Sequence, residues 1–186
     1  GETWLTIDDE KMKGYIFVAS VPGQSLRYCQ IYPTKAQESW GAFHEAAFIF
    51  FAGIFPEVTY DNDSVLVTKI LGKERKQSQF SQELEDHYGF ISRFCNPAAG
   101  NEKGAVENAV GYCRRNYLPG NPKFTNWSEC NAYLEQVCKT DIWEGKHYRT
   151  KEKKSDIYHK LKEKLKPLLP KRKWRIWHIA RVDKTQ

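Results

Sequence analysis

The 186-residue sequence lacks several features that would mark a particular class of protein. No apolar run reaches the roughly 18 residues that span a bilayer, and the first residues lack the basic-then-apolar order of a signal peptide. The five cysteines are odd in number and contain no C-x-x-C pair, which argues against a disulfide framework and against a zinc knuckle. We therefore expect an intracellular protein.

Nucleotide-binding and nucleophile motifs are also missing. There is no G-x-x-x-x-G-K-S/T loop and no G-x-G-x-x-G fingerprint. Neither Cys29 nor Cys95 is surrounded by a nucleophile elbow or an oxyanion motif. Cys130 and Cys138 share an expected helix, and His44 lies on an apolar helix face, so we interpret all three as core residues.

The composition favours a folded protein with an uneven charge. Hydrophobic residues make up 40% and charged residues 28%, and the length suits one main domain with an appendage. Residues 139–175 hold 14 Lys or Arg against 5 Asp or Glu, whereas the other segments hold 15 basic and 18 acidic residues. Such asymmetry fits either a surface that meets phosphates or a solvated Lys-rich helix, and charge alone does not separate the two.

The first half of the sequence predicts the element order β-β-β-α-β-α-β. Asp8-Asp9-Glu10 interrupts the chain between the first and second strands, and Pro22-Gly23 separates the second strand from the third. A capping box of Thr34 and Gln37 opens a long amphipathic helix that ends at Gly53. The expected strands are 4–7, 15–21, 25–32, 57–60 and 90–95. Between the last two, we expect a short extended piece at 65–67, a polar basic stretch at 72–78, and a helix that ends at Gly89.

The second half predicts helices. After a loop at 96–104, an apolar stripe runs along a helix, with Lys103, Glu107 and Arg114 on an adjacent polar stripe. The run 118–122, Leu-Pro-Gly-Asn-Pro, breaks this helix and is the candidate domain boundary. Asn126 and Glu129 form a second capping box, and a Lys-rich helix is expected over 155–166.

Two carboxylates are candidates for metal chemistry. Asp61 follows the strand 57–60, where α/β folds gather their ligands, and Glu107 lies in the later helix. Two oxygen ligands on separate elements suit Mg²⁺, and two such ions can support an in-line displacement at phosphorus. Asp61 alone is also consistent with a turn, and Glu107 alone with a solvated helix face, so the metal-site hypothesis depends on the two residues together.

Longer runs resemble a known family. They are Gly14–Ala19, His44–Phe48, Phe51–Pro56, Tyr60-Asp61-Asn62, His87–Phe90, Arg93–Pro97 and Asn101–Tyr112. These runs resemble the IstA-type transposase of two-gene bacterial insertion sequences, and the last is similar to its third-carboxylate region. The resemblance continues into 165–170 and so covers nearly the whole chain.

The resemblance implies an α/β, RNase H-like integrase core with a mixed five-stranded sheet flanked by helices over 1–118, followed by a Lys-rich helical extension over 119–186. It implies a D-D-E site with Asp61 as the second carboxylate and Glu107 as the third, two Mg²⁺ or Mn²⁺ ions, and DNA contacts from Asn101, Lys103 and Arg114. It also implies insertion-sequence ends and target DNA as substrates, an AAA+ ATPase helper, a homo-oligomer on DNA, and a cytoplasmic, nucleoid-associated location.

The sequence departs from this family at the first carboxylate. The family carries that Asp in V-D-x-G-E-x-W, and here the sequence opens at Gly1-Glu2-Thr3-Trp4, just after it. We expect the first Asp to lie upstream, which would leave this fragment inactive, although Asp8 or Asp9 could substitute. The alternatives to a strand-transfer enzyme are a catalytically dead DNA-binding module and an RNase H-like nuclease acting on hybrids or junctions.

Overall fold

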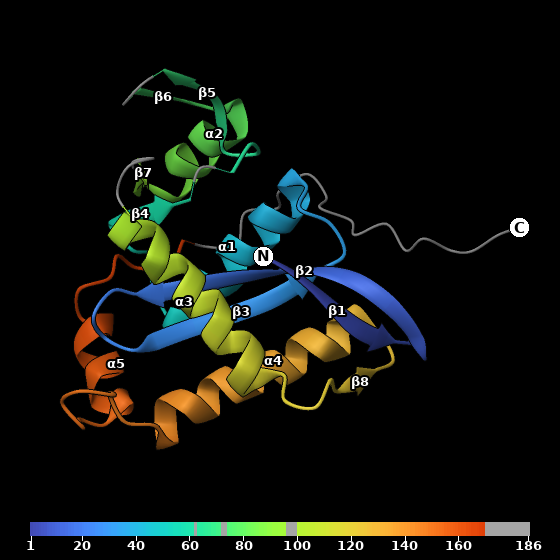
Figure 1. The fold of residues 1–186 in the computed structure, drawn as a ribbon. Coiled ribbons are helices and arrows are strands. Elements are labelled where there is room, and N and C mark those ends of the chain that lie inside the picture. Colours follow the sequence, from blue (N-terminus) through green and yellow to red (C-terminus); the bar gives the residue numbers. More distant parts are fainter. Residues whose placement is uncertain (62, 72–73, 96–99, 170–186) are drawn as a thin grey trace, which may run out of the picture.

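The structure is a computed structural model that describes residues 1–61, 63–71, 74–95 and 100–169, with the side chains of 69–71, 74–75 and 100–107 outside that description. Figure 1 shows a curved sheet with helices on both sides. The strands are β1 (Glu2–Ile7), β2 (Glu10–Val21), β3 (Leu26–Tyr32), β4 (Glu57–Tyr60), β5 (Val67–Leu71), β6 (Glu74–Gln77), β7 (Ile91–Phe94) and β8 (Lys123–Phe124). The helices are α1 (Gln37–Phe51), α2 (Gln79–Tyr88), α3 (Gly100–Tyr117), α4 (Trp127–Glu144) and α5 (Lys154–Lys162).

The first three strands form an antiparallel meander, as predicted. Asp8 and Asp9 turn the chain between β1 and β2 with φ of 53° and 58°, at the interruption that the sequence predicted. β8 pairs in parallel with the end of β1, giving the sheet order β3-β2-β1-β8. β4 and β7 form a separate parallel pair, so the described strands do not make the continuous five-stranded sheet that we expected. β8 pairs only with Thr6 and Ile7 of β1, and among the described strands none pairs with the rest of that edge.

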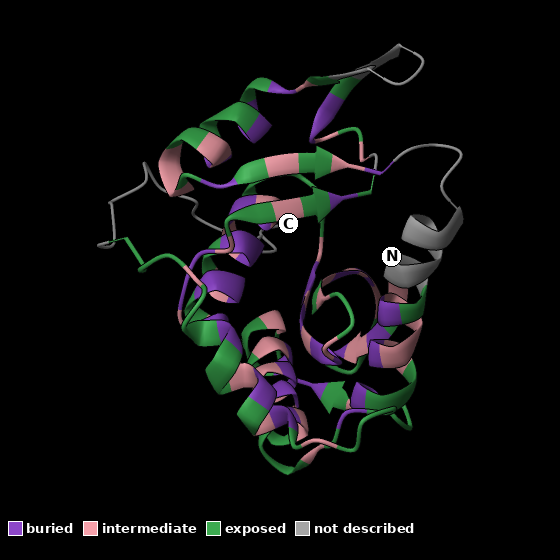
Figure 2. Ribbon diagram, turned by 90° about the vertical axis from the view of Figure 1, so that its left-hand side faces the viewer, coloured by how far each residue is buried: buried purple, intermediate pink, exposed green. Residues whose placement is uncertain are grey.

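The main core lies where these strands meet α1, α3, α4 and α5. Its fully buried members include Tyr28, Ile31, Cys113, Leu134 and Cys138. α4 packs on β3 and α3 packs on β2, because the apolar stripe of each helix faces the sheet. In Figure 2 the helix ribbons alternate between purple, buried residues and green, exposed residues, as expected for helices that bury one face.

A second core forms above the sheet around β4, β7 and α2. Its buried residues are Phe48, Ile54, Tyr60, Leu66, Val67, Phe80, Leu84 and Phe90. α2 ends at Gly89 with φ of 69°, the left-handed C-cap that the sequence predicted. β5 and β6 form an antiparallel hairpin. Sequence reasoning missed it, because it interpreted 72–78 as a polar stretch without structure.

Several predicted helix boundaries were wrong by a few residues. α1 begins after Ala36, and Thr34 forms no capping box, since its hydroxyl meets Ser39 instead. α3 already begins at Gly100, inside the expected loop, and α5 ends at Lys162 rather than 166. The cap at Asn126 is confirmed, because its Oδ1 accepts the Glu129 amide at 2.8 Å.

The break after α3 is present, but the chain then returns to the main core. Gly120 and Asn121 adopt φ of 72° and 51°, and α4 follows after β8. Cys130, Leu134 and Ile142 of α4 are buried in the same cluster as Cys113 of α3. A domain boundary near 118 stays a prediction. None of the helices in the described residues is both long and apolar enough for a membrane span.

Candidate functional site

Asp61 lies at the carboxyl end of the parallel β4–β7 pair. The ladder continues one step past the strands, because the Cys95 amide donates to the Tyr60 carbonyl at 2.9 Å. Asp61 follows directly and is exposed. The turn after it is fixed by Asp63, whose carboxylate accepts the Val65 amide at 3.0 Å and pairs with Lys35 at 3.4 Å. Asp61 therefore stands on an ordered edge that a ligand can reach.

A buried histidine braces this edge from α1. The Nδ1–H of His44 donates to the Trp40 carbonyl at 2.7 Å, and its Nε2 accepts the Tyr60 hydroxyl at 2.7 Å. Burial lowers the pKa of His44 to about 4, because the charged imidazolium would be desolvated there. The prediction of a satisfied core histidine is confirmed, and the ring also fixes the residue before Asp61.

Helix α3 carries the other predicted site residues. Asn101, Lys103 and Glu107 belong to its first half, and their side chains lie outside the described residues. Their roles as DNA contacts and metal ligand stay predictions. Arg114, in the second half, is half-buried and donates through Nη2 to the Glu2 carbonyl of β1. Part of its hydrogen-bonding capacity is thus used within the fold, and its contact with DNA also stays a prediction.

The first residue of the chain lies between α3 and the loop after β4. Gly1 and Ile16 exchange backbone hydrogen bonds of 3.0 and 2.8 Å, so β1 is paired from its first residue. A Cβ at Gly1 would meet the side chains of Arg114 and Val110. The side chains of Arg114, Lys35 and Asp63 all lie close enough to the Gly1 backbone to act on it electrostatically. Three elements, β1, α3 and the loop of Asp63, therefore converge here.

Asp8 and Asp9 stand at the opposite end of β1. The strand between them and Gly1 has 6 residues, a span of about 20 Å at the usual rise per residue. Asp9 lies 3.6 Å from Lys123 and is exposed. The hairpin turn thus keeps both carboxylates away from the edge that carries Asp61.

The described residues contain no group of three His, Cys, Asp or Glu side chains placed to hold a metal ion. All five cysteines are buried and none forms a disulfide, and the prediction that Cys130 and Cys138 are core residues is confirmed. Burial raises the pKa of Cys130 to about 12, so its thiol stays protonated at neutral pH. The oxygen chemistry of Asp61 fits a hard cation such as Mg²⁺ better than a soft one.

Sequence reasoning missed two residues that position this edge. Lys35 precedes α1 and pairs with Asp63, and Tyr60 holds His44 while preceding Asp61. The aromatic Tyr60 beside a candidate ligand was a usable signal for the second. Lys35 gave none, because a lysine before a helix is ordinarily solvated.

The chain is similar in sequence to transposases. It is 32% identical to a transposase of Aminobacter aminovorans over 143 residues, 76% of this chain and 28% of that protein. It is 33% identical to the IS21 transposase of Pseudomonas aeruginosa over 139 residues, 73% of this chain and 35% of that protein. The chain thus spans about a third of the length of these relatives. No family model matches the sequence.

Solved structures show the same fold. The catalytic core domain of BIV integrase matches with a TM-score of 0.57 and 12% identity, covering 87% of this chain and 93% of that one. The HTLV-2 integrase catalytic core in complex with magnesium matches with a TM-score of 0.51 and 14% identity, covering 86% of this chain and 93% of that one. The RNase H-like fold predicted from the sequence is confirmed.

Proposed function

We propose that this homologue of insertion-sequence transposases, which has the fold of integrase catalytic cores, supplies the catalytic core for DNA 3′-end cleavage and strand transfer. The observation that carries the proposal is the position of Asp61 at the carboxyl end of β4, beside the strand that leads into α3. α3 carries Glu107, the second predicted ligand. The substrates are the ends of an insertion sequence and the target DNA.

Asp61 and Glu107 are the residues that would hold Mg²⁺ or Mn²⁺, two ions in the complete site. Such ions supply positive charge where an attacking oxygen forms and a leaving oxygen departs at phosphorus. The protein holds the edge of β4 in place through the His44–Tyr60 hydrogen bond and the Lys35–Asp63 pair. Lys103 and Asn101 would bind the DNA backbone beside it. The attacking group is water in cleavage and the DNA 3′-hydroxyl in strand transfer.

In a longer chain that followed the family's V-D-x-G-E-x-W pattern, the first carboxylate of the D-D-E set would stand two residues before Gly1. β1 and β2 are antiparallel, with Glu2 opposite Tyr15. A residue three positions before Glu2 would therefore lie opposite Val18 if the pairing continued. Side chains alternate along a strand, and the added residue would therefore share the face of Gly1. That face meets Val110 and Arg114 of α3, one and two turns after Glu107. An Asp at this position would point toward the helix of Glu107.

The test uses a longer chain that carries this upstream Asp, with labelled transposon-end DNA and Mg²⁺ or Mn²⁺. Glu107→Gln or Asp61→Asn should lower strand transfer at least about a hundred-fold, because each removes a charged metal ligand. DNA binding should be unchanged. Glu135→Gln on α4, an equal chemical change next to Lys139, is the matched control and should keep full activity.

Strand transfer that survives Glu107→Gln would refute the site. Intact DNA binding without any strand transfer in the longer chain would instead favour a non-catalytic DNA-binding module. Cleavage of RNA–DNA hybrids with no joining of transposon ends would favour a nuclease. The proposal also includes an AAA+ ATPase partner and the assembly of several copies of the protein on DNA. Co-purification of these components with DNA would test both.

A further inference from the structure

The segment between α4 and α5, together with α5 itself, forms a basic surface that the proposed catalytic site does not use. We name it the α5 surface and define it as residues 145–164. It contains eight Lys or Arg against three Asp or Glu. Figure 1 places it at one end of the sheet, below β4 and β7. It is thus separate from the edge that carries Asp61.

The loop of this surface displays its cations outward. Lys146, Arg149, Lys151 and Lys153 are all exposed, and within the loop only Glu152 opposes them. The Arg149 guanidinium stacks over the exposed Tyr148 ring, 5.1 Å from its centre. Lys146, Arg149 and Lys153 form no ion pair with any described residue. The charges are therefore available to an anionic partner.

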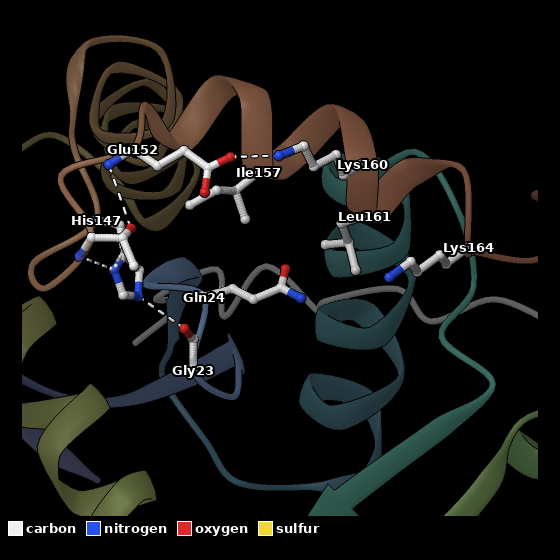
Figure 3. A pocket seen from close by; sticks show the side chains of 9 residues that line it. Gly23, Gln24, His147, Glu152, Ile157, Lys160, Leu161 and Lys164 are labelled. Atoms are coloured by element: carbon white, nitrogen blue, oxygen red, sulfur yellow. Dashed lines mark hydrogen bonds and ion pairs between the residues drawn. The ribbon is translucent and has the colours of Figure 1, made fainter.

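The same loop is built rigidly from beneath. His147 is buried, and its Nε2–H donates to the Gly23 carbonyl at 2.8 Å. Its Nδ1 accepts the Thr150 amide at 3.1 Å and the Arg149 amide at 3.3 Å. Figure 3 shows this ring anchoring the loop to the β2–β3 turn. A solvated, unconstrained lysine tract has no need of such an anchor.

A second buried contact fixes the start of α5. The Lys154 ammonium is 4% exposed and pairs with Asp141 of α4 at 2.7 Å. The Lys154 amide also donates to the Gly145 carbonyl at 3.0 Å, which closes the loop at its neck. The backbone that carries the exposed cations is therefore held in place, which lowers the entropy lost on binding.

A hollow of about 240 Å³ lies between the β2–β3 turn and α5. Lys160 and Lys164 line one side, and Gln24 lines the other. Lys160 pairs with Glu152 at 2.6 Å, whereas Lys164 forms no ion pair with a described residue. The loop contributes Thr150 and Glu152 to the same hollow, and these residues are next in sequence to the exposed Arg149, Lys151 and Lys153.

We propose that the α5 surface binds the phosphate backbone of duplex DNA, independently of base sequence. This proposal rests on the proposed function for the identity of the polyanion. Cations spread over a loop and a helix match the regularly spaced charges of a duplex. An anionic membrane is a poorer match, because Tyr148 is the one large apolar side chain exposed within 145–164, and Arg149 covers it.

The test measures binding of the full chain to a labelled duplex of arbitrary sequence by fluorescence anisotropy across a salt series. Arg149→Gln combined with Lys164→Gln should weaken binding at least about ten-fold at moderate salt and reduce the salt slope by about two. The matched control removes two cations at the other end of the sheet, Lys11→Gln combined with Lys123→Gln. It should leave affinity within about two-fold.

Equal losses in the two double variants, or no loss in the first, would overturn the proposal. So would tighter binding to phosphatidylserine vesicles than to DNA. Both double variants change exposed residues, so their unfolding free energies should equal that of the parent. Urea unfolding checks that each variant is folded. Asp61→Asn and Glu107→Gln should bind DNA as the parent does, so a failure of strand transfer alone counts against the catalytic site and leaves the α5 surface standing.

Discussion

The main core and the second core differ in how they are held together. The main core is crossed by long antiparallel ladders, and four helices cover it. The second core has a four-residue parallel pair, one short helix and a hairpin. Nevertheless the second core carries Asp61, the predicted ligand. Asp61, the residue with the most specific predicted function, therefore lies in the part of the molecule that has fewer strand-to-strand hydrogen bonds.

Helix α1 joins the two cores. Phe43, Ala47 and Phe51 face the main core, whereas Phe48 packs in the second. His44 lies between them, with its ring against Trp40 and Phe90 and its Nε2 on the Tyr60 hydroxyl. The position of the Asp61 edge therefore depends on a helix whose own stability comes mainly from the main core.

The largest expected effect is in the main core. Asp141 accepts the Tyr117 hydroxyl at 2.8 Å and the Lys154 ammonium at 2.7 Å. Asp141→Asn would leave the buried Lys154 charge unpaired, which costs about 3 to 5 kcal/mol of unfolding free energy. Urea unfolding measures this directly. The double variant Asp141→Asn with Lys154→Met should recover most of the loss, and a single variant as stable as the parent would contradict the buried pair.

A smaller effect is expected where the two cores meet. The pKa of His44 is about 4 in the folded protein against 6.5 ordinarily, so between these values only the unfolded chain binds the proton. The unfolding free energy should fall as pH decreases below about 6.5, by about 1.3 kcal/mol between pH 7.5 and pH 5.5. His44→Gln should remove this part of the pH dependence, as judged by urea unfolding at pH 7.5 and 5.5. Parallel curves for the parent and the variant would exclude a buried neutral histidine.

The smallest effects compare one helix cap in each core. Asn126 caps α4 through the Glu129 amide at 2.8 Å, and Ser78 caps α2 through the Ser81 amide at 3.1 Å. Asn126→Ala and Ser78→Ala should each cost about 1 kcal/mol. Hydrogen exchange should separate them, because the loss at Ser78 speeds exchange mainly in α2, β4 and β7. Uniformly faster exchange in both variants would mean that the two cores open together.

Most of the elements could be predicted from the sequence. The Asp8-Asp9 turn, the strand before Asp61 and the end of α2 at Gly89 follow from local turn and cap chemistry. The β5–β6 hairpin and the early start of α3 could not be predicted, because polar residues there give no periodic pattern. The candidate site was predicted only in part. Asp61 and Glu107 came from spacing and resemblance, while Lys35 and Tyr60 were found only in the structure.

By itself the sequence determined the local order of this protein: where most strands and helices lie, where α2 ends, and where basic residues collect. These depend on neighbours in the chain, whose side chains and backbone conformations act over a few residues. Only the tertiary structure decided that His44 braces Tyr60, that Gly1 meets α3, and that His147 anchors a basic loop to the β2–β3 turn. Those contacts join residues far apart in the chain, and they exist because burial of the apolar faces brings the elements together.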